Sequence, residues 1–145
     1  MLNCAPTQLF SIWKGENVPG VIQIESEVGL TTRSFKDVCD FARFALRRRL
    51  KNVLNEDSLD DPKSPVAQAT EIQSALRHIK YAAQETRDQN PSPDDVRLQQ
   101  IVTICDEMSE LVDIQVRSAG RMWQVNAETI LVATYKRVSR CEEAD

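Results

Sequence analysis

The sequence predicts a mainly α-helical protein, a helical bundle of about four helices with a short N-terminal β-hairpin. Apolar residues recur every three or four positions over most of the chain after residue 34, which is the period of a helix with one buried face. Helix-start signals built from Ser, Pro or Asp precede three of these periodic stretches. Alternation of apolar and polar residues between turn residues, which is typical of strands, is confined to the first 33 positions.

Size and composition are those of one globular domain. With 145 residues and 41% hydrophobic content, the chain can bury one continuous core, so we expect residues 1–145 to form a single domain. No stretch approaches the roughly 18 apolar residues that span a bilayer, and the N-terminus has no secretory signal. We therefore expect an intracellular protein, cytoplasmic or nuclear, in a reducing environment and without a membrane partner.

The predicted hairpin occupies residues 1–33. Residues 7–13 form a strand-like run, residues 14–20 are dense in turn residues, and residues 21–28 alternate well enough to return as a second strand. An isolated two-stranded hairpin is only marginally stable. We expect it to pack on the helices.

Four helices are expected, at residues 34–54, 65–89, 93–118 and 121–141. A capping box begins at Ser34. Pro65 and Pro93 each follow a serine, an arrangement that places a capping hydroxyl and a first-turn proline at a helix start. The polar and acidic stretch 55–63 is expected to connect the first two helices.

Gly120 decides between two arrangements of the C-terminal half. If it ends the third helix in a left-handed conformation, a fourth helix turns back and the chain forms a compact bundle. If the helix continues through it, residues 93–140 form a rod of roughly 70 Å, which needs a second chain. We favour the bundle because glycine inside a helix costs about 1 kcal/mol relative to alanine. The four helices then also have similar lengths.

The third helix has the most regular apolar seam of the chain. Its apolar residues alternate at spacings of three and four, the pattern of helices that pack along their length. We expect this seam to make the protein a homo-oligomer by burying apolar side chains, at roughly 1.5–3 kcal/mol for each large one. The residues expected at the oligomer interface are Leu98, Ile101, Cys105, Met108 and Val112.

The first helix is basic, whereas the rest of the chain is acidic. Residues 1–55 have a net charge of +3 and the remainder −7. Basic groups interleaved with aromatic rings are typical of surfaces that neutralise phosphates and stack on bases. Packing of the rings and pairing of the arginines with acids is the purely structural interpretation, and docking of an acidic protein surface is a third. The residues expected to bind RNA or another polyanion are Lys36, Arg43, Phe44, Arg47, Arg48, Arg49 and Lys51.

The sequence offers few residues for catalysis or metal binding. His78 is its one histidine, so neither a two-histidine metal site nor a catalytic triad without this residue can form. The four glycines make no phosphate-binding loop. The four cysteines are widely spaced and are expected to be free thiols, with Cys39 and Cys105 on apolar helix faces. We expect no catalytic residue, no metal and no cofactor.

One short motif resembles a known family. The sequence FSIWK at 10–14, the alternating strand after it and a helix with arginines at 47–49 resemble the order of elements in the coat proteins of rod-shaped plant viruses. In that family two helices precede the aromatic motif, whereas almost nothing precedes it here. The resemblance covers fewer than half of the residues, and we assign no family from it.

Together these features predict a non-catalytic binding or assembly protein. It would self-associate through its helical seams and contact RNA or another polyanion through the basic face of its first helix. The alternative is a protein–protein adaptor or regulator without a nucleic-acid role, and an enzyme of unfamiliar type ranks third. Salt dependence separates the first two, because binding to phosphates releases counterions.

Overall fold

The computed structural model describes residues 10–11, 21–23, 34–54, 64–89 and 91–143, and its chain divides into two compact units, residues 1–33 and 34–145. In the first unit, strands β1 (Phe10–Ser11) and β2 (Val21–Gln23) pair antiparallel. The rest of the predicted hairpin lies outside the described residues. The hairpin and the single-domain organisation therefore remain predictions.

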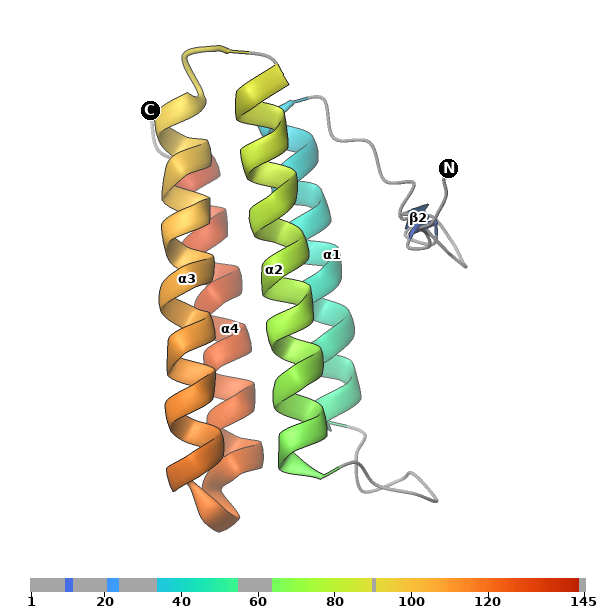
Figure 1. The fold of residues 1–145 in the computed structure, drawn as a ribbon, viewed down its shortest axis with the longest axis vertical. Helices are drawn as coiled ribbons and strands as arrows, with labels where there is room; N and C mark the ends of the chain where they lie inside the picture. The colour runs from blue at the N-terminus through green and yellow to red at the C-terminus, as the bar shows by residue number, and fades with distance from the viewer. Residues whose placement is uncertain (1–9, 12–20, 24–33, 55–63, 90, 144–145) are drawn as a thin grey trace. The chain divides into compact units, whose positions relative to one another are not determined.

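The second unit is an antiparallel bundle in which each helix reverses the direction of the one before it (Figure 1). Its helices are α1 (Phe35–Leu54), α2 (Pro65–Gln89), α3 (Asp95–Ser118) and α4 (Trp123–Glu143). The 3-10 helix η3 (Gly120–Met122) joins α3 to α4. The four predicted helices are confirmed, each beginning and ending within two residues of its predicted bounds.

Serine caps begin two of the helices as expected, and the third start differs. The hydroxyls of Ser34 and Ser64 each accept a hydrogen bond of 3.1 Å from the backbone amide three residues later. The hydroxyl of Ser92 instead accepts from the amide of Asp94, inside a turn. Helix α3 therefore begins at Asp95 rather than at the proline.

Gly120 ends α3, which settles the choice between bundle and rod. Its φ of 54° lies in the left-handed region, which costs glycine little and other residues much more. The amide of Ala119 closes the last turn by donating to the carbonyl of Gln115 at 2.8 Å. Helix α4 then runs back along α3 (Figure 1), so the compact bundle is confirmed.

The five residues predicted at the oligomer interface lie in the core of a single chain. Leu98, Ile101, Cys105, Met108 and Val112 are each between 0 and 7% exposed. Helices α2 and α4 of the same chain pack against α3 and supply the apolar partners of its seam. This corrects the prediction, because a second copy cannot reach these side chains while the bundle is folded.

The cysteines in the described part of the chain behave as small apolar residues. Cys39, Cys105 and Cys141 are free and buried. Burial raises the pKa of the Cys39 and Cys105 thiols to about 12, which keeps them protonated and unreactive. Among the helices that the structure describes, none is both long and apolar enough to cross a membrane.

Candidate nucleic-acid interface

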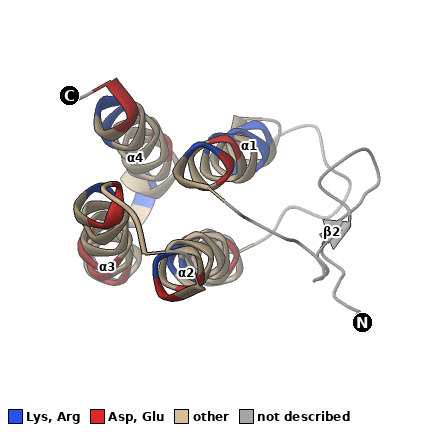
Figure 2. Cartoon of the chain, turned by 90° about the horizontal axis from the view of Figure 1, so that it is seen from above, with Lys and Arg blue, Asp and Glu red and all other residues tan. Residues whose placement is uncertain are grey.

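The basic residues of α1 lie outside the bundle because the other face of the helix is committed to the core. Val38, Ala42 and Leu46 are at most 1% exposed and form the inner face. At 100° per residue, most of the basic positions fall away from this face. Figure 2, in which blue marks Lys and Arg, shows basic residues of α1 on the outside of the bundle.

In the first half of α1, carboxylates already neutralise the basic groups. Arg43 donates to Asp40 at 2.9 Å and to Glu142 at the end of α4 at 2.6 Å, and its side chain is only 17% exposed. Lys36 donates to the other oxygen of Asp40 at 3.0 Å. We call these four residues the paired half. It fastens α1 to α4 and has little charge left for a phosphate.

The pKa values in the paired half agree with this geometry. The hydrogen bond to Glu142 raises the pKa of Arg43, although partial burial opposes it. Partial burial raises the pKa of Asp40, but the hydrogen bonds from Lys36 and Arg43 outweigh it and hold the pKa below its usual range. Arg43 and Asp40 are therefore charged at neutral pH.

Arg49 has a structural role instead of the predicted contact with RNA. Its side chain turns toward α2, where Nε donates to the backbone carbonyl of Glu71 at 3.1 Å. Burial lowers the pKa of its guanidinium group, as expected for a cation taken partly out of water. We therefore leave Arg49 out of the candidate site.

In the second half of α1, Arg47, Arg48 and Lys51 are exposed and make no ion pair with any residue that the structure describes. The guanidinium carbon of Arg48 lies 5.9 Å from the centre of the Phe44 ring. That of Arg47 lies 5.8 Å from the centre of the Tyr135 ring in α4. We call these five residues the open half. It combines accessible positive charge with two aromatic rings.

Sequence reasoning missed Tyr135, which lies more than 80 positions from Arg47 along the chain. Its neighbour Thr134 is fully buried, so the helical period places Tyr135 at the edge of the inner face of α4. Which helix lies beside that edge depends on how the bundle is arranged. The pattern of a single helix does not contain this information.

The open half presents the kinds of group that bind anions. Guanidinium and ammonium groups bind phosphate through charge-assisted hydrogen bonds, and aromatic rings stack on bases. Within the described ranges, no three His, Cys, Asp or Glu side chains lie close enough together to hold a metal ion. His78 lies on an exposed position of α2.

No protein-family model matches this chain, and no curated protein or solved structure matches it either.

Proposed function

We propose that this protein is a non-catalytic binding protein that contacts RNA, or another polyanion, through the open half of α1. One observation supports the proposal above the rest. Arg47, Arg48 and Lys51 lie within about 6 Å along one helix and have no carboxylate partner in the described part of the chain. Three exposed cations so close together repel one another, and a chain of phosphates relieves that repulsion.

The aromatic rings favour single-stranded RNA over a duplex. Arg48 lies over Phe44 and Arg47 over Tyr135, so each ring already has a guanidinium group near it. An unpaired base can stack on such a ring or on the guanidinium plane, whereas the bases of a duplex are stacked on one another. Contact with phosphates and base faces carries little sequence information, so we expect binding with weak sequence preference.

The test measures how the affinity for RNA depends on salt. The full chain is titrated into a fluorescein-labelled oligouridylate of about 16 nucleotides, and anisotropy is followed from about 50 to 200 mM salt. Each phosphate contact contributes about 0.7 to the slope of log K against log salt for a single strand. Replacing Arg47, Arg48 and Lys51 with alanine should therefore reduce the magnitude of the slope by about 2.

A matched control removes the same charge elsewhere on the bundle. Arg77, Arg117 and Arg121 are also exposed, and their replacement with alanine changes the net charge equally. We expect this control to keep most of the slope of the unmodified protein. If both triple variants bind RNA alike, the open half is not the site, and the alternative role as an adaptor or regulator without nucleic acid gains weight.

The predicted homo-oligomer needs a surface other than the seam of α3. Met108 and its neighbours in the seam are buried within one chain, so association between folded copies must use exposed residues.

A further inference from the structure

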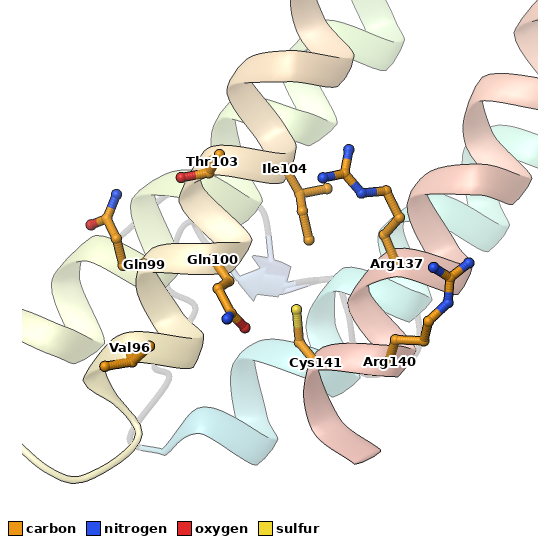
Figure 3. A pocket seen from close by; sticks show the side chains of 8 residues that line it. All are labelled: Val96, Gln99, Gln100, Thr103, Ile104, Arg137, Arg140 and Cys141. Atoms are coloured by element: carbon orange, nitrogen blue, oxygen red, sulfur yellow. The ribbon is translucent and has the colours of Figure 1, made fainter. Parts of the chain in front are cut away.

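A hollow of about 590 Å³ lies between α3 and α4. In Figure 3, Gln100 and Ile104 of α3 and Cys141 of α4 point into the space between the two helices. Ile104 and Cys141 are at most 8% exposed and make the floor apolar. Arg137 and Arg140 of α4 lie along the rim. The hollow thus combines an apolar floor with a positively charged border.

A second hollow, of about 510 Å³, lies along α4 and shares Arg137 and Arg140 with the first. It adds the exposed Lys136. We call Lys136, Arg137 and Arg140 the basic edge. Arg137 donates to Glu107 at 2.8 Å, but both side chains are at least a third exposed, and a pair of this kind is weak enough to exchange. Arg140 has no ion pair within the described ranges.

The opposite flank of α3, beside α2, is acidic. Asp106, Glu110 and Asp113 recur at spacings of four and three, so they form one exposed row. Asp106 accepts a hydrogen bond of 2.7 Å from the Lys80 ammonium, a solvent-exposed ion pair of the weak kind that can exchange, and Asp113 accepts one of 2.7 Å from the Gln73 amide. Glu110 lies between them and has no hydrogen bond or ion pair in the described part of the chain. We call these three residues the acidic edge.

We propose that the acidic edge of one copy docks on the basic edge of a second copy, over the hollow between its α3 and α4. The two edges have opposite charge, and each lies along one helix of the bundle. The acidic row spans about 10 Å and the basic row about 6 Å at 1.5 Å per residue. Each molecule carries both edges, so a second copy of the chain provides the complementary charge and no other protein is needed.

The position of the edges determines the kind of assembly. The acidic edge lies on the flank of α3 beside α2, whereas the basic edge lies on α4, so a contact between two copies uses different surfaces and leaves one free edge on each. Such a heterologous contact repeats until a ring closes or a filament grows. This proposal goes beyond polyanion binding, because the contact needs no RNA.

An assembly held by exposed charges responds to salt in a definite direction. Screening weakens interactions between exposed charges beyond the Debye length of about 10 Å at 0.1 M salt. Added salt should therefore dissociate these copies. An apolar interface would persist or strengthen under the same change.

The experiment is a charge exchange between two variants, with the mass measured by light scattering on nuclease-treated protein at about 0.05 M salt. The unmodified chain should exceed the mass of one copy and grow with concentration. Arg140→Glu removes charge complementarity at the basic edge, and Glu110→Arg does so at the acidic edge. Each variant alone should associate at least about tenfold more weakly. An equimolar mixture should recover the association, because each variant then meets its charge complement.

Matched controls reverse charges away from both edges. Arg48→Glu lies on the open half of α1 and Glu85→Arg on an exposed position of α2. Neither should change the mass, although Arg48→Glu should weaken RNA binding, so failure of one proposal can be told from failure of the other. Lys136→Glu repeats the basic-edge test if Arg140→Glu does not fold, which circular dichroism would show.

Three results would overturn the proposal. The first is an unmodified chain that keeps the mass of one copy at every concentration. The second is a mass that Arg140→Glu and Glu110→Arg leave unchanged. The third is a mixture of these two variants that stays dissociated, which would mean that the edges do not pair with each other.

Discussion

The seam of α3 and the outer face of α1 have equally clear patterns in the sequence, yet the fold treats them differently. The seam is fully enclosed by α2 and α4 of its own chain. The face of α1 is divided, with the paired half closed by Asp40 and Glu142 and the open half exposed. The sequence predicts that both surfaces bind a partner. In the folded chain, only the open half of α1 remains accessible to one.

The difference shows what each kind of pattern reports. A regular apolar row indicates that something covers it, but it does not say whether the cover comes from the same chain or from another. A row of cations on an exposed face indicates where positive charge lies. Its availability depends on acids such as Glu142, which the fold brings from the far end of the chain.

The largest expected change in stability comes from truncating a buried residue in the seam of α3. Ile101 is 0% exposed in the core, and truncating a buried isoleucine removes apolar contacts and leaves a cavity. Ile101→Ala should therefore lower the free energy of unfolding by about 2–5 kcal/mol. Urea unfolding followed by circular dichroism measures this loss.

Ile114 provides the matched control on the same helix. It is 45% exposed, so Ile114→Ala removes much less buried surface, and we expect a change within about 0.5 kcal/mol. A seam that joined two chains would give another result. Ile101→Ala would then shift the mass toward a single copy, and the stability of that copy would be almost unchanged.

The next effect compares the two halves of α1. Arg43→Ala leaves the carboxylates of Asp40 and Glu142 without their shared donor, which should cost about 1–3 kcal/mol of unfolding free energy. Arg47→Ala removes an exposed cation near a ring, and its cost should stay below about 1 kcal/mol. The order should reverse for RNA affinity, where Arg47→Ala is the more damaging change.

Arg43→Lys refines this comparison. A single ammonium group lacks the planar fork with which Arg43 reaches Asp40 and Glu142 together, so lysine should restore only part of the lost stability. Equal stability of Arg43→Ala and Arg47→Ala would mean that the paired half does not fasten α1 to α4.

The sequence is sufficient to predict where the helices begin and end, but it does not show which helices contact one another. The caps at Ser34 and Ser64 and the turn at Gly120 are local signals, which is why the helix bounds and the bundle could be predicted. The start of α3 is two residues later than predicted because the Ser92 hydroxyl accepts from the amide of Asp94 in a turn. The residue types in this segment do not show which amide donates to that hydroxyl. For the site, the pattern located the basic face. Arg49 lies seven residues after Ala42, so the helical period places it beside the inner face, but the helix that it meets, like the contact of Arg47 with Tyr135, depends on the order of helices around the core.

The smallest expected effect is a pH dependence from the paired half. The pKa of Asp40 is lower in the folded chain than its usual value of 3.8, so the unfolded chain takes up the proton first. The stability from Asp40 is therefore present above about pH 4 and is lost as the pH falls through the folded pKa. Because the side chain is 42% exposed, solvent screens the charges, and we expect a contribution below about 1 kcal/mol.

Asp40→Asn should lower the urea midpoint at pH 7 and match the unmodified protein in acid, where both side chains are neutral. Glu128→Gln, whose carboxylate is exposed on α4 and has no ion pair in the described part of the chain, is the control. A midpoint difference between Asp40→Asn and the unmodified chain that persists undiminished at pH 3 would show that the hydrogen-bonding shape of the side chain, rather than its charge, stabilises the paired half.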